Sequence, residues 1–289
     1  SSRLIVFPKT AGKLSGFTIG PKTTRPRPGE ISSRRAGSGN DFFTTRQLLP
    51  GEPAKRINWK ASARMADEDK LLSNEFTSLQ VAETLIVLDC QSNLGAKERV
   101  NSIALFSVRA TMSTAERLLR DKNRVGLLAI GSTSERVAPS YGRRQYDKIA
   151  MTLCKFSPGQ ASLGESVSNT IRYFYPRVSQ IVLISPLMDE ENRRVAFDLA
   201  RSSGTFDLMI LSPNHLDFPL EKTPKNRLRK SREGRIAWRL AEAERRSIIA
   251  RLETTRAIVL DWHVVEPLEQ VVEAHRYMVA RRIAQLAKY

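Results

Sequence analysis

The run Thr84-Leu-Ile-Val-Leu-Asp89 decides the fold of this chain. It is short and apolar, contains several β-branched residues, and ends in an acid. Strands that are buried on both faces of a parallel sheet read as continuous apolar runs of this kind. Ligands of such sheets bind beyond the carboxyl ends of the strands. The run therefore predicts a central parallel strand with Asp89 at the functional edge of the sheet.

Downstream of this run, segments typical of buried strands alternate with segments typical of amphipathic helices. This alternation predicts an α/β fold, with an open, mostly parallel sheet and helices on both faces. The predicted strands cover residues 84–89, 124–130, 181–184, 206–211 and 257–261, with a hairpin-like return at 134–139. The predicted helices cover residues 96–120, 146–156, 190–202, 233–253 and 268–288.

Upstream lies a second informative stretch, DFFTTRQLLPGEPAKRINWKASAR, at residues 41–64. The dipeptide Pro50-Gly51 marks a turn. Two acids and five bases crowd around it: Asp41, Glu52, Arg46, Lys55, Arg56, Lys60 and Arg64. Because guanidinium groups hold carboxylates in a bidentate way, this density predicts a fixed polar network. The alternative is a solvated basic loop.

The pattern Arg46-x-x-x-Pro-Gly-Glu52, followed by Lys55-Arg-Ile-Asn-Trp-Lys-Ala-Ser-Ala-Arg64, resembles the signature of the domain of unknown function 58 family. Members of that family carry a von Willebrand factor A-like domain. The resemblance continues through Leu71-Leu72 and Glu75-Phe76 to the strand that ends at Asp89, and it includes the order of the later elements. It departs from the family pattern at three positions, where Leu48 replaces a tyrosine, Glu52 an aspartate and Lys55 an arginine.

The resemblance assigns signature and partner-binding roles to Arg46, Pro50, Gly51, Glu52, Lys55, Arg56, Asn58, Trp59 and Arg64. Within this set we expect a polar clamp made of Arg46, Glu52, Lys55 and Arg56 to hold the signature turn. Trp59 is expected to dock the turn on the sheet. Glu52 and Lys55 keep the family's charges with a different reach, so the polar contact is expected to keep its character and change its geometry.

The N-terminal 40 residues contain strand-like runs at 4–7 and 17–19, broken by Gly, Pro and Ser. This pattern predicts an irregular β extension, partly mobile from about residue 23 to residue 40. We accordingly divide the chain into residues 1–80, the β extension with the signature segment, and residues 81–289, the von Willebrand factor A-like domain.

Von Willebrand factor A domains hold a divalent cation at the carboxyl edge with oxygen ligands from three loops. By that resemblance the ligands here would be Asp89, Ser92 and Asp189. The pattern is eroded, because Gln91 and Asn93 replace two serines, Ala161 replaces a threonine, and Pro186 follows Ser185 where an aspartate is common. A single anionic ligand makes a poor magnesium site, so we expect no metal and no other cofactor. Asp89 would then cap a helix or pair with a base.

Other catalytic patterns are absent from the sequence. His215, His263 and His275 lie far apart and show no metal-ligand spacing, which favours surface or packing roles. There is no Gly-rich phosphate loop and no Gly-x-Ser-x-Gly elbow, which argues against nucleotide hydrolysis and serine-hydrolase chemistry. We therefore expect a protein that is not an enzyme.

The composition, 41% hydrophobic and 27% charged, is that of a soluble globular protein. No apolar run approaches the roughly 18 residues that span a bilayer. The two cysteines, Cys90 and Cys154, predict a reducing compartment rather than a disulfide framework. The first residue is Ser, so we expect a piece of a longer chain. Many family relatives carry membrane helices before this point, so the resemblance implies a cytoplasmic domain that is tethered to a membrane in such proteins.

The charge is strongly basic, with 47 Lys and Arg against 30 Asp and Glu and a net charge of +17. Such a surplus favours partners that are polyanions, whether nucleic acid, anionic lipid or an acidic protein face. Much of it lies in the run KTPKNRLRKSREGRIAWR at residues 222–239. Trp238 in this run would either stack on a base or pack into the domain.

Two functional hypotheses follow. The resemblance implies a non-enzymatic adaptor that presents its sheet edge and its signature, residues 46–64, to a MoxR-type AAA+ ATPase in the assembly or remodelling of protein complexes. It implies no small-molecule substrate. The alternative is a basic module that binds nucleic acid or an anionic membrane through residues 222–239. A metal-dependent hydrolase is a third and weaker reading.

Overall fold

A computed structural model describes residues 26–49, 51–64, 71–80, 83–91, 97–159, 167–218 and 231–274. The chain contacts divide it into two compact units, one spanning Thr24–Ala82 and the other containing Glu83 and the rest of the α/β sheet. Each unit is described by itself. No helix in the described ranges is long and apolar enough to cross a membrane.

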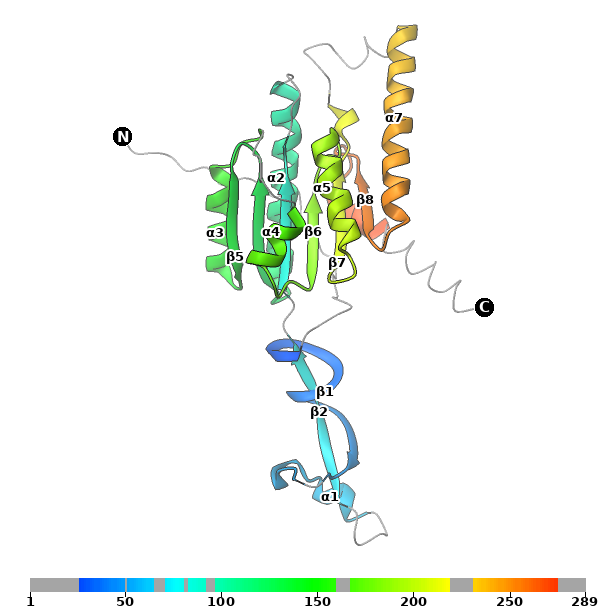
Figure 1. The fold of residues 1–289 in the computed structure, drawn as a ribbon. Helices are drawn as coiled ribbons and strands as arrows, with labels where there is room; N and C mark the ends of the chain where they lie inside the picture. The colour runs from blue at the N-terminus through cyan, green and yellow to red at the C-terminus, as the bar shows by residue number, and fades with distance from the viewer. Residues whose placement is uncertain are drawn as a thin grey trace, which may run out of the picture. The chain divides into compact units, whose positions relative to one another are not determined.

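The smaller unit is a two-stranded antiparallel sheet with two short helical turns (Figure 1). Strand β1, Pro26–Gln47, pairs with β2, Leu72–Gln80. The 3-10 turn η1, Ala54–Arg56, and the one-turn helix α1, Trp59–Ser62, lie between them. We expected an irregular extension before residue 40; the structure has a strand whose pairing shifts register four times. The strand-like runs at 4–7 and 17–19 lie outside the described residues.

The larger unit is built on a six-stranded sheet in the order β5-β4-β3-β6-β7-β8. All neighbouring strands are parallel except β4 and β5, which form the predicted hairpin-like return. The prediction of an α/β fold with a mostly parallel sheet is confirmed. The strands are β3, Glu83–Asp89; β4, Arg124–Ile130; β5, Ser134–Ser140; β6, Gln180–Ile184; β7, Asp207–Pro213; and β8, Ile258–Trp262.

Helices cover both faces of this sheet. Those with described bounds are α2, Lys97–Arg120; α3, Arg143–Cys154; α4, Val167–Phe174; α5, Glu190–Arg201; α7, Arg232–Glu253; and a helix at 268–274. The 3-10 turn η2, His215–Asp217, follows β7. The rest of the helix predicted at 268–288 lies outside the described residues.

The sheet separates the core into two clusters, one on each face, and β3 contributes side chains to both. Ile86 and Leu88 pack into one cluster with α2, α3 and the helix at 268–274, whereas Leu85 and Val87 pack into the other with α4, α5 and α7. All four side chains are completely buried. Successive side chains of a strand point to opposite faces, so an uninterrupted apolar run is what a strand covered on both faces requires.

Two helices differ from the sequence prediction. Helix α3 begins at Arg143, three residues before the predicted start, because the Gln145 side chain is buried and donates to the carbonyls of Val125 and Ala138. A polar residue in that role does not register as part of an apolar face. Helix α4 was not predicted, because eight residues give too few turns for a clear period.

Candidate functional site

The direction in which successive strands are added to the sheet reverses between β3 and β6. This position at the carboxyl edge is a topological switch point. From β3 the chain continues outward to β4 and β5, and it then returns to the other side of β3 as β6. Ligands of open α/β sheets bind at such a point. Asp89 ends β3 and Ser185 directly follows β6, so the two residues face this position from neighbouring strands.

Asp89 is completely buried and both of its carboxylate oxygens accept hydrogen bonds. Its Oδ2 accepts from Ser185 Oγ and from Asn192 Nδ2, each at 3.0 Å. Its Oδ1 accepts from the backbone N and the side-chain Nε2 of Gln91, at 3.3 and 3.2 Å. The sequence suggested a helix cap or a basic partner for Asp89. That was wrong, because the described partners are neutral donors on two loops and on helix α5.

Burial raises the pKa of Asp89 from 3.8 to about 6, although the hydrogen bonds from Gln91, Asn192 and Ser185 act in the opposite direction. Removing a carboxylate from water disfavours its charged form, while donors directed at its oxygens favour that form. Desolvation is the larger of the two effects here. The carboxyl group therefore changes its protonation state close to neutral pH.

Asp189, another residue of the predicted metal set, does not join Asp89. Asp189 caps helix α5, where its Oδ1 accepts from the backbone N of Asn192 at 3.2 Å. A carboxylate at this position also complements the helix dipole. Ser92 lies outside the described residues. The second loop does approach, because Gly159 forms a bridge with Gln91, but residues 160–166 also lie outside the described ranges.

Among the described residues, the groups directed at Asp89 are neutral hydrogen-bond donors. Magnesium and calcium need several oxygen ligands, more than one of them usually anionic. Asn192 directs its NH₂ group at Asp89, while its oxygen accepts from the backbone N of Met188 at 3.4 Å. In the described parts of the chain, no group of three His, Cys, Asp or Glu side chains is placed to hold a metal. In the part of this edge that the structure describes, these donors satisfy one buried carboxyl group.

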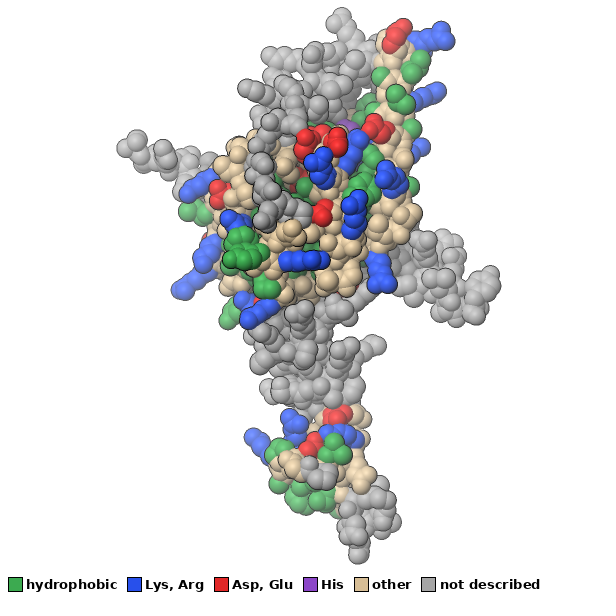
Figure 2. Space-filling model, viewed as in Figure 1, with side chains coloured by type: hydrophobic (Ala, Val, Ile, Leu, Met, Phe, Trp, Pro, Cys, Tyr) green, Lys and Arg blue, Asp and Glu red, His purple; other side chains and the backbone are tan. Residues whose placement is uncertain are grey.

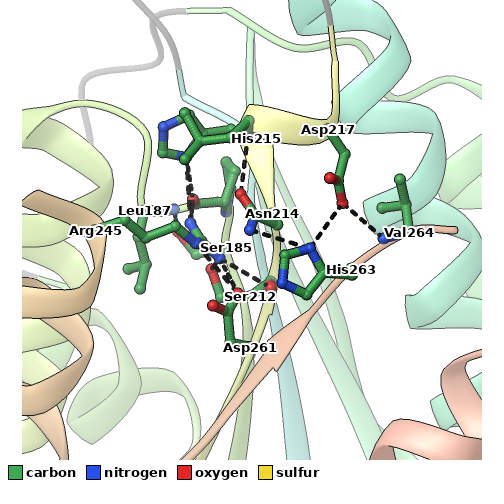
Figure 3. A network of polar contacts seen from close by, with 12 residues as sticks. Ser185, Leu187, Ser212, Asn214, His215, Asp217, Arg245, Asp261, His263 and Val264 are labelled. Atoms are coloured by element: carbon green, nitrogen blue, oxygen red, sulfur yellow. Dashed lines mark hydrogen bonds and ion pairs between the residues drawn. The ribbon is translucent and has the colours of Figure 1, made fainter. Parts of the chain in front are cut away.

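A second polar network at the same edge was missed by sequence reasoning. Arg245 on α7 is only 3% exposed and reaches the ends of β6, β7 and β8 (Figure 3). Its Nε and Nη2 donate to Asp261 Oδ1, at 3.2 and 2.6 Å, and Nη2 also donates to Ser212 Oγ at 2.9 Å. Its Nη1 donates to the Pro186 carbonyl at 2.9 Å and to His215 Nδ1 at 3.2 Å. Every guanidinium N–H therefore has an acceptor.

The histidines in this region have structural roles. Since a guanidinium can only donate, His215 Nδ1 accepts from Arg245 and its ring proton is assigned to Nε2. His263 lies 3.4 Å from Asp217, whose carboxylate also accepts from the backbone N of Val264 at 3.1 Å. These contacts tie η2 to the segment after β8. The sequence did not predict that His215 and His263 come together in one network, and His275 lies outside the described residues.

In the smaller unit, the signature turn is held by Arg46. Its Nη2 donates to Glu52 Oε1 and its Nε to Glu75 Oε1, both at 2.5 Å. Glu52 also accepts from the backbone N of Leu49, and the hydrogen bond from Arg46 lowers the pKa of Glu52. The Glu52 backbone N bonds the Leu49 carbonyl at 3.2 Å across Gly51, whose φ of +89° explains why the turn needs glycine.

The rest of the predicted clamp differs from expectation. We expected Lys55 and Arg56 to complete the clamp. In the structure, Glu75 on β2 is the second partner of Arg46. Lys55 is exposed, and Arg56 acts on Glu52 only as a nearby charge. The clamp therefore joins Arg46 on β1 to one acid in the turn and one on β2. Pro50 lies outside the described residues.

Asn58 attaches helix α1 to β2. Its Oδ1 accepts from the backbone N of Ala61, which caps the helix, and its Nδ2 donates to Asn74 Oδ1 at 2.8 Å. One turn later, Ser62 Oγ accepts from the backbone N of Leu72. Residues 58 and 62 are four apart and share one face of the helix, so that face is bound to β2.

Trp59 lies outside the attached face of α1. Its side chain is 63% exposed, so our expectation that it docks the turn on the sheet was wrong. Leu49 in the same turn is also exposed, together with Lys55, Lys60 and Arg64. Figure 2 shows hydrophobic side chains beside Lys and Arg side chains on the surface of this unit. We call the exposed residues Leu49, Lys55, Trp59, Lys60 and Arg64 the signature surface.

The fold and the site define an open α/β domain in which the described polar groups at the carboxyl edge bond to one another. An added antiparallel unit carries the signature turn. The family model described as "Protein of unknown function DUF58" matches residues 44–233, which include the turn and strands β3 to β7 of the sheet. The chain belongs to this family. A search of curated proteins finds no significant match.

Proposed function

We propose that this chain is a non-enzymatic protein-interaction module that binds its partner through the signature surface. Following the von Willebrand factor A-like resemblance, the proposed partner is a cytoplasmic MoxR-type AAA+ ATPase that assembles or remodels protein complexes. The chain would act as an adaptor. The smaller unit presents the signature surface, and the larger unit offers other surfaces for further contacts.

The observation that carries this proposal is an exposed tryptophan on a fixed turn. Trp59 exposes 63% of its side chain, while the clamp formed by Arg46, Glu52 and Glu75 holds the turn in one conformation. Tryptophan and arginine are enriched among the residues that dominate binding at protein interfaces. A rigid surface loses little conformational entropy on binding, which favours affinity.

The chemistry of the carboxyl edge supports a non-enzymatic role. Asp89 is buried and its oxygens are occupied by donors from the chain itself. Arg245 is likewise fully bonded within the fold. In the described part of this edge, the strongest polar groups hold loops together. Both networks fit a scaffold that acts by binding and has no need of a metal.

The test is the affinity of a MoxR-type ATPase from the same organism for wild-type chain and for Trp59→Ala, measured by biolayer interferometry. We expect Trp59→Ala to weaken binding at least tenfold, because loss of an interface tryptophan commonly costs about 2 kcal/mol or more. Tyr141→Ala is the control, since Tyr141 is 70% exposed on the larger unit. It should leave the affinity unchanged. Equal affinities for wild type and Trp59→Ala would refute the proposal.

The alternative hypothesis, binding of nucleic acid or an anionic membrane through residues 222–239, stays a prediction. Residues 222–230 lie outside the described ranges. The described remainder begins α7, where Arg232, Arg235 and Arg239 are exposed and Trp238 is half-buried. Steep weakening of binding with salt would support this alternative.

A further inference from the structure

Helix α7 carries apolar residues on two opposite faces. The inner face packs on the sheet through residues that include Arg245, Ile248 and Leu252, all of them buried. At 3.6 residues per turn, a residue five or nine positions before Arg245 lies on the far side of the helix. Leu240 and Ile236 occupy those positions. An amphipathic helix on a globular domain needs only one apolar face, so the second is unexplained by the fold.

The residues of this second face follow one regular spacing. They are Ile236, Leu240, Ala243, Ser247 and Ala250, and we call them the outer stripe. Their separations of four, three, four and three residues are those of the a and d positions of a coiled coil. All five are exposed; the relative exposure is 59% for Ile236 and 70% for Leu240.

The outer stripe is accessible, and α7 is attached to the sheet edge next to it. In Figure 1 the N-terminal half of α7 extends past the carboxyl ends of the strands. No residue from 231 to 244 is buried, whereas Arg245 anchors the helix at the sheet edge through Asp261, Ser212 and Pro186. The anchor holds the direction of the projecting half.

The charges beside the outer stripe are mainly positive. Arg232, Arg239 and Arg246 recur every seven residues along one edge, which is the g position of the same heptad. Arg246 pairs with Glu242 on the same helix. On the other edge, Glu244 is already paired with Arg193, and Arg251 lies over the ring of Phe197. Arg232 and Arg239 are exposed at the projecting end.

We propose that the outer stripe docks an amphipathic helix of a protein partner whose flanking residues are acidic. The spacing fits a helix, and the arginines complement acids at its e and g positions. The small residues Ala243, Ser247 and Ala250 allow close approach of a helix and offer little to insert into a bilayer. This site shares no residue with the signature surface, and the proposal does not depend on that surface.

A second copy of the chain fits the outer stripe less well. An antiparallel pair of α7 helices would place the arginines at positions 232, 239 and 246 against one another. A parallel pair would place Arg246 opposite Arg251 of the other copy; it would also place Arg239 opposite Glu244, but Glu244 is already paired with Arg193. Either arrangement brings like charges together, which disfavours self-pairing.

The experiment uses the full chain and a synthetic peptide of about three heptads with Leu at a and d and Glu at e and g. The glutamates keep the free peptide from pairing with itself. A matched peptide carries Lys in place of Glu. We expect the wild-type chain to bind the acidic peptide in isothermal titration, and the basic peptide at least tenfold more weakly.

Leu240→Asn should weaken binding of the acidic peptide at least tenfold, and Arg239→Gln should weaken it severalfold. Leu105→Asn is the matched control, because Leu105 is also an exposed helical leucine, on α2, and it should change nothing. Melting temperatures check that each variant is folded. Trp59→Ala should bind the peptide like wild type, which separates this site from the signature surface.

Three results would overturn the proposal. The first is failure of the acidic peptide to bind, or equal binding by Leu240→Asn. The second is binding of anionic vesicles that is lost in Leu240→Asn, which would make the outer stripe a membrane contact. The third is a dimer of the wild-type chain in analytical ultracentrifugation that Leu240→Asn dissociates, which would make it a contact between copies.

Discussion

At the scale of single residues, Asp89 shows what sequence can and cannot predict. Its place at the end of a buried strand was predictable, because an apolar run ending in an acid marks that position. Its partners were not, because Ser185 and Asn192 lie 96 and 103 residues away and reach it only through the strand order. The departures from the cation-binding loop pattern were readable in the sequence, whereas the hydrogen bonds to Asp89 were not. The same holds for Glu75, which completes the clamp on Arg46 from another strand.

A pH prediction follows from the buried Asp89. Its pKa is raised from 3.8 to about 6 in the folded chain, so the folded state binds the proton more tightly than the unfolded state. Its contribution to stability is therefore full at pH values below about 4 and is lost as the pH rises through 6. Relative to Asp89→Asn, wild type should lose roughly 3 kcal/mol of unfolding free energy across this range.

Urea denaturation of wild type and Asp89→Asn between pH 4 and pH 8 measures this difference. Asparagine does not titrate, and effects common to both proteins, such as the lowered pKa of Glu52, cancel in the comparison. The difference curve should fall between pH 4 and pH 6 and then level off. Parallel stability curves would show that Asp89 is not desolvated in the folded chain.

At the scale of elements, long periodic segments were predicted well and short or polar ones were not. Helices α2, α5 and α7 begin and end within a residue of their predicted bounds. Helix α4 was missed because it spans only eight residues, and α3 was placed late because its first turn buries a glutamine. The attachment of α7 to the sheet edge by Arg245 was also missed. An arginine among the apolar positions of the inner face was a readable signal for it.

The attachment of α7 gives a second stability prediction. Arg245→Met should destabilise the larger unit by about 3–5 kcal/mol, because it removes a buried cation and leaves its acceptors without their donor. Arg245→Lys should not restore stability, since an ammonium cannot reproduce the planar five-donor fork.

The neighbouring Arg246→Met serves as the control for this measurement. Arg246 is exposed and pairs with Glu242 at the surface, so its loss should cost less than about 1 kcal/mol. The free energies of unfolding come from urea titration at fixed pH. Similar losses at positions 245 and 246 would mean that the Arg245 network does not hold α7 to the sheet.

At the scale of the whole molecule, the sequence predicted an α/β sheet with an added β segment, and the structure has both. It did not predict which surfaces remain available. Trp59 was expected to be buried and is exposed, because the attached face of α1 is set by Asn58 and Ser62. Which residues of a short helix are buried depends on which of its sides packs against the rest of the fold. A helix of one turn is too short for the sequence to show an apolar period.

We propose that the partner binds the signature surface rather than the carboxyl edge of the sheet. Hydrogen exchange of the full chain, with and without a MoxR-type ATPase, tests it most directly. We expect slower exchange on binding at residues 48–64, with no change at 89–91 and 185–192. Protection at the carboxyl edge with none in the signature turn would contradict it.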